Sequence, residues 1–257
     1  GRDLGVVLGH VLGGFRLHDV ARRLDLGLCL LLRNRRLPRL LARRTHVRAL
    51  AVIQSRHLAT ARQRLAEIEE EHPHTRGRVE LCEGDITLPG LGLTAVADDE
   101  LEAITEVWHL AAVYDLAVPT DVAHRVNVDG TAAVLDFCRS RPRLERLQYV
   151  STCYVSGSYD GVFAEDDLER RQQFRNHYES TKFQAEVWVR ESMDKVPTAI
   201  YRPAIVVGDS ESGLTQKFDG PYFMLRAIGV SMKRGWPIAK YGKSAAPFNV
   251  VPVDFVV

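Results

Sequence analysis

The residues of this chain best suited to chemistry are a tyrosine and a lysine four positions apart, Tyr178 and Lys182. They stand near the start of a run of helix-forming residues, and on a helix this spacing places both side chains on one face, one turn apart. An ammonium near a phenol favours the phenolate, so the spacing predicts a pKa for Tyr178 below its usual value of about 10. Such a tyrosine can exchange a proton with a carbonyl or alcohol oxygen. Taken alone, the same spacing is also common on solvated surface helices.

Two hydroxyl residues, Ser151 and Thr152, end an apolar segment that precedes Tyr178 in the chain. If that segment is a buried strand, its end is where ligands bind in a parallel sheet, and a hydroxyl there can hold a substrate oxygen beside the phenol. The alternative is that both hydroxyls satisfy local backbone groups. The presence of Tyr178 and Lys182 favours the first interpretation.

The elements that must position these residues follow an alternating pattern. From about residue 46 onward, short β-branched segments alternate with longer segments of helical period, which is typical of βαβ units around a parallel sheet. We therefore predict an α/β fold with a Rossmann-type doubly wound parallel sheet. The expected strands are 46–52, 78–82, 106–112, 147–155 and 198–207, and the expected helices are 58–71, 121–139 and 176–193.

Composition narrows the class of protein. Lys plus Arg (34) nearly balances Asp plus Glu (33), so no overall field favours nucleic acid or an anionic membrane, although arginines are concentrated between Arg22 and Arg48. That concentration fits a phosphate-binding face or, more simply, solvated helices. The four cysteines lack metal-ligand or CxxC spacing, so we expect no metal site, no disulfides and a cytoplasmic location. The apolar run 24–32 is too short to span a membrane.

A longer series of motifs carries a resemblance to a known family. In order, the motifs are Gly84-Asp85-Ile86-Thr87, Leu91-Gly92-Leu93, Trp108-His109-Leu110-Ala111-Ala112, Asn127-Val128-Asp129-Gly130-Thr131, Ser151-Thr152, Tyr178 to Lys182, and Tyr201-Arg202-Pro203-Ala204-Ile205-Val206-Val207-Gly208. The series covers roughly two thirds of the chain, and its order resembles that of the extended short-chain dehydrogenase/reductases. Within them it is similar to the acyl-thioester (fatty acyl-CoA) reductase, or male-sterility-like, branch.

The resemblance implies a catalytic set of three residues. Tyr178 would be the general acid/base, and Lys182 would bind the nicotinamide ribose and lower the tyrosine pKa. Thr152 would be the hydroxyl partner, preferred over Ser151 because it lies five residues before Gly157, the spacing that the family shows.

The resemblance also implies a set of cofactor-binding and supporting positions. Asp85 and Ile86 would lie at the adenine, and Asn127 and Ser151 would support the active site, with Asn127 bracing the active-site helix. Simpler readings are a turn cap for Asp85 and an ordinary helix start for Asn127. The remaining implied positions are Ala111 and Ala112 along the cofactor's path, and Pro203, Ala204 and Val206 around the nicotinamide.

One part of the family pattern is missing. The family begins with a strand leading into a TGxxGxxG loop that holds the pyrophosphate at a helix N-terminus. Gly9, Gly13 and Gly14 come closest, but their spacing differs and no convincing strand is recognisable before them. Residues 1–45 therefore look foreign to the fold. There are three explanations: a divergent loop, loss of cofactor binding in a decayed homologue, or a frame error that scrambled the first βα unit. The sharp return of the family pattern near residue 46 favours the frame error.

The sequence leads to the following functional hypothesis. We expect an NAD(P)-binding domain at 1–210, atypical over 1–45, and a truncated start of a smaller substrate-binding part at 211–257. NADP is preferred over NAD because Arg56 follows the second strand and suits a 2′-phosphate. The predicted activity is reduction of a carbonyl, most simply an acyl-CoA or carrier-protein thioester. The alternatives are a dehydrogenase or epimerase acting on a sugar nucleotide or sterol-type alcohol, and an inactive homologue or nucleotide sensor. A homodimer is a further possibility, and no nucleic acid or membrane span is expected.

Overall fold

The computed structural model describes residues 4–8, 36–114, 118–215, 220–238 and 248–256. The chain divides into two compact units, Gly1–Pro203 and Ala204–Val256. The division falls ahead of the boundary expected at 210. Among the described helices, none combines the length and apolar character needed to cross a membrane.

The first unit is built on a six-stranded parallel sheet. Its strands are β1 (Leu4–Leu8), β2 (Arg48–Ile53), β3 (Val79–Glu83), β4 (Ile104–His109), β5 (Arg146–Val150) and β6 (Thr198–Tyr201), in the spatial order β3-β2-β1-β4-β5-β6. The strand order reverses between β1 and β4, which makes this sheet doubly wound. The predicted fold class is confirmed.

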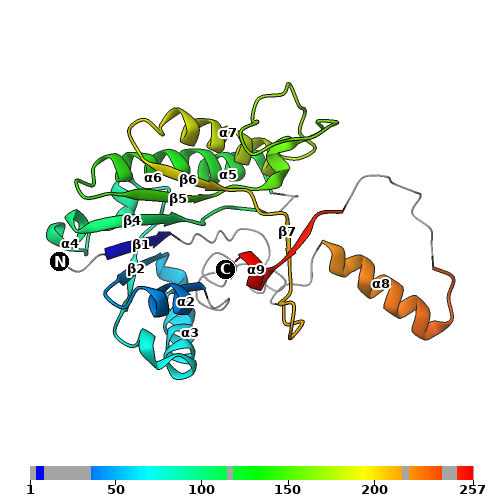
Figure 1. Cartoon of the computed structure of the whole chain (residues 1–257), viewed down its shortest axis with the longest axis horizontal. Coiled ribbons are helices and arrows are strands. Elements are labelled where there is room, and N and C mark those ends of the chain that lie inside the picture. Colours follow the sequence, from blue (N-terminus) through cyan, green and yellow to red (C-terminus); the bar gives the residue numbers. More distant parts are fainter. Residues whose placement is uncertain (1–3, 9–35, 115–117, 216–219, 239–247, 257) are drawn as a thin grey trace. The chain divides into compact units, whose positions relative to one another are not determined.

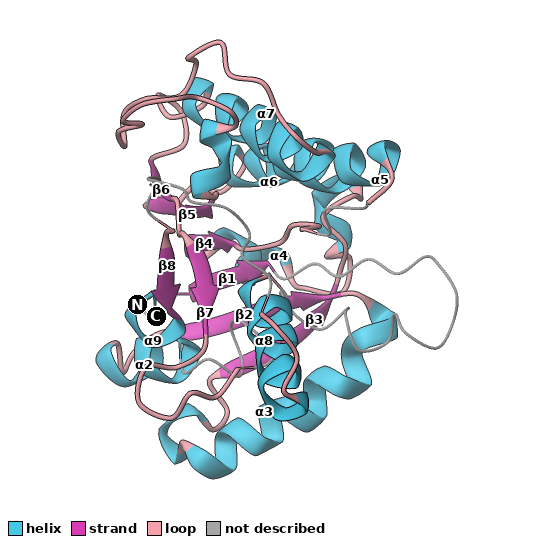
Figure 2. Ribbon diagram, turned by 90° about the vertical axis from the view of Figure 1, so that its right-hand side faces the viewer, coloured by secondary structure: helices cyan, strands magenta, loops and turns pink. Residues whose placement is uncertain are grey.

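Helices cover both faces of this sheet (Figures 1 and 2). One face carries α2 (Arg36–Arg43) and α3 (Leu58–Glu71), with an apolar layer that includes Leu41, Ala51 and Ala61. The other carries α5 (Thr120–His124), a π-helical turn (Arg125–Asp129), α6 (Gly130–Arg139) and α7 (His177–Glu191). The short α4 (Asp98–Glu102) precedes β4. The second apolar layer contains the fully buried side chains of β5 and brings the catalytic candidates of α7 close to that strand.

The strand predicted at 106–112 ends at His109, and two other predicted strands are cut short by a turn or a proline. The segment 147–155 is a strand only to Val150, after which Cys153–Ser156 forms a 3-10 turn capped by Thr152. The segment 198–207 is interrupted at Pro203, which has no N–H to give to a ladder, and β7 (Ile205–Val207) belongs to the second unit. In both places the chain leaves the sheet at the edge where ligands are expected.

The interpretation of residues 1–45 as foreign to the fold is wrong for the first strand. Leu4–Leu8 pairs with β2 on one side and β4 on the other, at the centre of the sheet. A short strand inside a parallel sheet is a brief apolar run without alternation, and this one is only Leu-Gly-Val-Val-Leu, which made it hard to recognise. The candidate glycines Gly9, Gly13 and Gly14 lie outside the described residues.

The second unit contains a small sheet and two helices. β7 (Ile205–Val207) pairs in parallel with β8 (Val250–Pro252), and α8 (Pro221–Arg234) and α9 (Val253–Val256) complete the described part. The hydroxyl of Tyr222 accepts the N–H of Gly208 at 2.7 Å, and Asp254 binds Ser210. A substrate-binding role for this part stays a prediction.

Candidate active site

Thr152 and Tyr178 come together at the carboxyl end of β5. Thr152 is buried and extended, and its hydroxyl accepts the N–H of Tyr154 at 3.3 Å. The same hydroxyl forms a hydrogen bond with the phenol of Tyr178, which stands in the first turn of α7. Asn176 begins that helix by accepting the N–H of Glu179 at 2.9 Å, a capping contact that fixes where the first turn lies.

The turn between these residues needs a glycine. Gly157 has a φ of +52°, and a Cβ there would lie 2.4 Å from the carbonyl oxygen of Gln173. No side chain fits that approach, so the turn that follows Thr152 packs directly against the segment leading into α7.

Lys182 is buried one turn further along α7, 2% exposed. Its ammonium donates to the hydroxyl of Tyr149 at 3.0 Å and to the carbonyl oxygen of Val150 at 2.9 Å. Both acceptors belong to β5. The lysine therefore lies on the same helix face as Tyr178, as the spacing predicts, but its head group is directed to the strand.

The pKa values of the pair differ from the expectation. Burial raises the pKa of Tyr178 to about 12, although the hydrogen bond from Thr152 offsets part of that rise. Burial lowers the pKa of Lys182 to about 7, and the Glu186 carboxylate offsets part of that fall. The predicted lowering of the Tyr178 pKa by Lys182 is wrong for this structure, because the ammonium is engaged by β5 and desolvation dominates. At neutral pH the phenol keeps its proton.

Ser151 takes a different partner from Thr152. Its hydroxyl donates to the fully buried carboxylate of Glu186 at 2.6 Å. The guanidinium of Arg202 lies 2.6 Å from the same carboxylate and that of Arg190 lies 3.1 Å from it. Ser151 therefore belongs to an ionic cluster, while Thr152 is the hydroxyl that meets Tyr178.

Asn127 joins three parts of the site. Its side chain exchanges two hydrogen bonds with the backbone of Val113, at 2.8 and 2.9 Å, and its amide donates to Thr181 on α7 at 3.0 Å. It is buried in the π-helical turn, a type of turn often found at functional sites. These contacts are those of a residue that braces the helix, which is the role the resemblance implies.

The expected adenine end is a small polar cluster after β2. Asp85 accepts Gln54 at 2.5 Å and both the N–H and the hydroxyl of Thr87 at 2.8 Å, so its carboxylate caps a turn. Arg56 donates to Gln54 and is exposed. Ile86 is 1% exposed and packs in the core against Gly130. Contact of these residues with a cofactor stays a prediction.

The remaining predicted positions fall in both units. Ala111 is buried and Ala112 half-buried just after β4, at the same sheet edge as Thr152. The carbonyl of Pro203 accepts the N–H of Cys153 at 3.1 Å. Ala204 and Val206 belong to the second unit, so their place around a nicotinamide stays a prediction.

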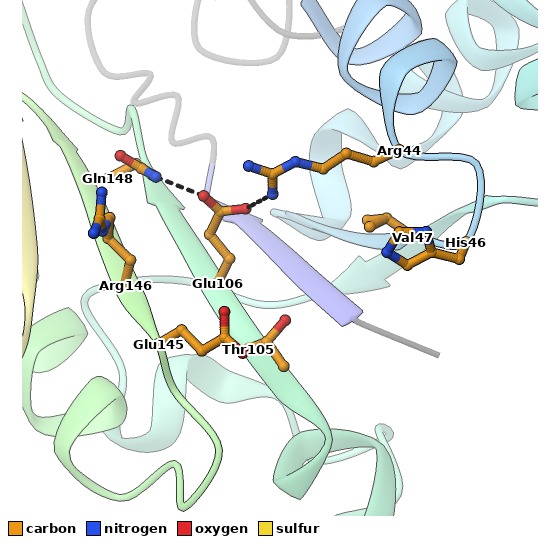
Figure 3. A pocket seen from close by; sticks show the side chains of 8 residues that line it. All are labelled: Arg44, His46, Val47, Thr105, Glu106, Glu145, Arg146 and Gln148. Carbon is orange, nitrogen blue, oxygen red and sulfur yellow. Dashed lines mark hydrogen bonds and ion pairs between the residues drawn. The ribbon is translucent and has the colours of Figure 1, made fainter. Parts of the chain in front are cut away.

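A charged pocket lies at the opposite, amino-terminal edge of the sheet (Figure 3). It has a volume of about 360 Å³, and Glu106 stands at its centre between Arg44, at 2.6 Å, and Gln148, at 2.5 Å. Its lining residues are Arg44, His46, Val47, Thr105, Glu106, Glu145, Arg146 and Gln148. None of the predicted catalytic residues is among them. The predicted catalytic residues lie at the other edge of the sheet.

Most of the chain matches one known protein family. Residues 35–257 match the male sterility protein family, an NAD-binding family. The chain belongs to this family. The predicted place among the extended short-chain dehydrogenase/reductases is confirmed, and with it a family of oxidoreductases that use a nicotinamide cofactor.

Known relatives of this male sterility family member are longer than the chain. "Fatty acyl-CoA reductase wat" of Drosophila melanogaster is 26% identical over 75% of the chain and 42% of its own length. The terminal R domain of the myxalamid PKS-NRPS pathway has a TM-score of 0.71 and 24% identity, covering 98% of the chain and 59% of the solved one. The UDP-glucuronic acid 4-epimerase of Bacillus cereus, solved with NAD, has a TM-score of 0.61 and 17% identity over 98% and 70% of the two chains. The two structures support the fold.

The sequence did not identify the buried residues that contact Lys182 and Ser151. Tyr149 was seen only as part of a strand, and Glu186 only as part of a helix. A buried glutamate eight residues after Tyr178, on the same helix, was the available signal, since a carboxylate on that face needs a cation. Nothing in the sequence marks Tyr149 as different from an ordinary core aromatic.

Proposed function

We propose that this chain carries the catalytic centre of an NADP(H)-dependent reductase of acyl thioesters, with Thr152, Tyr178 and Lys182 as its catalytic residues. The observation that carries the proposal is the placement of Thr152 and Tyr178 together at the carboxyl end of β5, with the buried ammonium of Lys182 one turn behind on α7. Family membership and the reductases among its relatives support the thioester as substrate.

The residues present fit a nicotinamide cofactor. An ammonium has three N–H groups. Among the described residues, Tyr149 and Val150 take two of those of Lys182, which leaves one for a ribose hydroxyl. A bound cofactor would supply the hydride. Arg56, exposed at the end of β2, is the residue that would meet a 2′-phosphate and favour NADP.

The chain's own residues would then manage the proton. A thioester carbonyl that receives a hydride develops negative charge on oxygen, and the hydroxyls of Thr152 and Tyr178 would donate hydrogen bonds to it. The raised pKa of Tyr178, about 12, keeps the phenol protonated at neutral pH, which is the form that a reduction requires. Exclusion of water from this buried corner would strengthen both contacts.

The test is cofactor binding followed by turnover. NADPH and NADH are titrated against the purified chain by nicotinamide fluorescence, and NADPH oxidation is then followed with a long-chain acyl-CoA. We expect tighter NADPH binding, lost in part in Arg56→Ala, and a fall in turnover of about 10²-fold or more in Thr152→Ala. Tyr201→Phe, which removes a phenol bonded to Gln148, is the matched control and should behave as the wild type.

The same experiment discriminates the other hypotheses. Conversion of a UDP-sugar with bound NAD, and no oxidation of NADPH by acyl-CoA, would indicate a sugar-nucleotide enzyme, the class of the Bacillus cereus structure. Binding of NADPH without turnover of either substrate would indicate a nucleotide sensor. A folded chain that binds neither cofactor would contradict the proposal.

A further inference from the structure

The head group of Lys182 is held by a residue with no assigned role. Tyr149 is fully buried on β5, and its hydroxyl accepts the ammonium at 3.0 Å. The ammonium also lies 4.5 Å from the centroid of the Tyr149 ring, within the range of a cation–π contact. One side chain therefore contacts the lysine through both its hydroxyl and its ring. Among the described residues, the backbone carbonyl of Val150 is the other hydrogen-bond acceptor of this ammonium.

A buried hydrogen-bonded chain continues behind Tyr149. Its hydroxyl is bonded to Thr131 on α6, and the Thr131 hydroxyl donates to the carbonyl of Asn127 at 2.7 Å. The Thr131 hydroxyl therefore lies between the carbonyl of Asn127 and the Tyr149 hydroxyl, which itself accepts from Lys182. His109 on β4 lies 3.0 Å from the same Thr131 oxygen.

This series of hydrogen bonds begins and ends on helix α7. Asn127, whose carbonyl ends it, donates with its side chain to Thr181, the neighbour of Lys182. Strand β5, helix α6, the π-helical turn and α7 are thus connected around the lysine through side-chain hydroxyls and amides. Every link is buried, so the links are shielded from competition with water.

We propose that Tyr149 is a positioning residue that fixes the ammonium of Lys182 on β5, at the place from which its remaining N–H would reach the cofactor ribose. The inference rests on the proposed function for the importance of the lysine, but the position itself is testable without turnover. Tyr149 does not touch the reacting atoms and acts through Lys182.

The groups that face Lys182 define what the removal of the Tyr149 hydroxyl should do. Glu186 and Tyr178 approach from α7, Tyr149 from β5 and, behind it, His109 from β4. Cys153 follows β5 beside Tyr178, and α6 contributes the uncharged Thr131. Glu186 is the charged group that favours the ammonium, and the Tyr149 hydroxyl and the Val150 carbonyl are its neutral acceptors among the described residues.

The experiment is a direct titration of Lys182. The chain has six lysines, so ¹³Cε-lysine labelling gives a small set of NMR signals, and the one missing from Lys182→Arg is assigned to Lys182. In the wild type this signal should titrate near pH 7. In Tyr149→Phe the ammonium loses an acceptor, and we expect the titration to move about one pH unit lower. Tyr201→Phe, which loses a phenol on another strand, should leave it unchanged.

Turnover provides the second measurement. If Lys182 must be charged, activity falls as pH rises through its pKa, and this falling limb should move about one unit lower in Tyr149→Phe. At pH 7 that shift reduces turnover about fivefold, with KM for the acyl-CoA unchanged. A structural defect would instead lower the amount of active protein at every pH.

The outcomes separate the two proposals. An unchanged lysine titration in a folded Tyr149→Phe overturns the positioning role, whatever the activity. A shifted titration in a chain that neither binds NADPH nor reduces acyl-CoA supports the positioning role and contradicts the proposed function. Should Tyr149→Phe fail to fold, Thr131→Val removes the hydroxyl bonded to that of Tyr149 and should give a smaller shift in the same direction. Thr131→Ser should restore the wild-type titration, and equal titrations in both Thr131 variants overturn the proposal.

Discussion

Helix α7 carries two buried charged groups whose surroundings are built in opposite ways. Near its start, the ammonium of Lys182 is held by neutral oxygens of β5, and burial lowers its pKa to about 7. One turn later, the carboxylate of Glu186 is surrounded by Arg202, Arg190 and the hydroxyl of Ser151. The first region leaves its charge weakly compensated and able to change, whereas the second pairs its charges. Under the proposed function, this difference would separate residues that take part in the reaction from residues that hold the fold.

The paired region also anchors a loop. Arg202 donates to the carbonyls of Ala164 and Asp167, and Arg190 donates to those of Glu165 and Asp166. The segment between β5 and α7 is thereby attached to the helix and to the end of β6. Its attachment depends on Glu186, which orients both guanidinium groups.

The largest effect is expected for Tyr178→Phe, in the reactive region. Loss of the phenol proton should reduce turnover of acyl-CoA about 10³-fold, the usual range for a general acid. The midpoint of thermal unfolding should stay within a few degrees of the wild type, because the ring still packs. Both are measured on the same preparation. A variant that keeps a tenth of the turnover would show that Tyr178 does not donate the proton.

Glu186→Gln should show the opposite pattern. Removing one partner of a buried ionic cluster leaves the guanidinium groups uncompensated, so we expect the free energy of unfolding to fall by about 3 kcal/mol. Urea denaturation measures it. Glu191→Gln, an exposed change on the same helix, is the control and should be nearly neutral. Equal stability of the two variants would mean that the cluster does not hold the fold.

The features that could be predicted from the sequence are those that depend on the local residue pattern. Helix α3 was predicted at its observed bounds, and Tyr178, Lys182 and Thr152 were chosen because their spacing and their place after a strand have a direct chemical meaning. The end of β5 was placed too late, since Cys153-Tyr154-Val155 has strand-like residues although Thr152 caps a turn there.

The supporting residues could not be predicted because their partners are distant in sequence. Glu186 meets Ser151 and Arg202 from different strands, and Lys182 meets Tyr149 across the interface between a helix and a sheet. No spacing rule connects such pairs. The direction of the Tyr178 pKa failed for the same reason: proximity on a helix says nothing of where the lysine head group is directed or how deeply both groups are buried.

A third prediction concerns the cost of keeping Lys182 buried. Its pKa is about 7 in the folded chain against a usual value near 10.5, so between these pH values the unfolded chain binds the proton and the folded chain does not. The contribution of Lys182 to the free energy of unfolding should therefore rise with pH across this window and be flat below it. Lys182→Met should be more stable than the wild type by about 2 kcal/mol at pH 7. As the pH rises above 7, this difference in the free energy of unfolding should change in favour of the wild type by up to about 1.4 kcal/mol per pH unit.

Urea denaturation of both proteins from pH 6 to pH 10 measures this difference. The difference between the two proteins is used because the raised pKa values of Cys82, Cys138 and Tyr178 lower the stability of both at the alkaline end. Lys195→Met, an exposed lysine, should show no such trend. A constant difference between wild type and Lys182→Met across the window would show that Lys182 stays charged when buried, and the contrast with the Glu186 cluster would disappear.

The smallest effect, Ser151→Ala, tests the border between the two regions. Ser151 and Thr152 are neighbours, yet the hydroxyl of Ser151 donates to Glu186 and that of Thr152 bonds to Tyr178. Because Glu186 keeps both arginines, loss of the serine hydroxyl should lower the free energy of unfolding by only about 1 kcal/mol. Turnover and its pH dependence should stay those of the wild type, in contrast to Thr152→Ala. If Ser151→Ala instead loses turnover as Thr152→Ala does, the serine hydroxyl reaches the substrate, and the two regions share a residue at the end of β5.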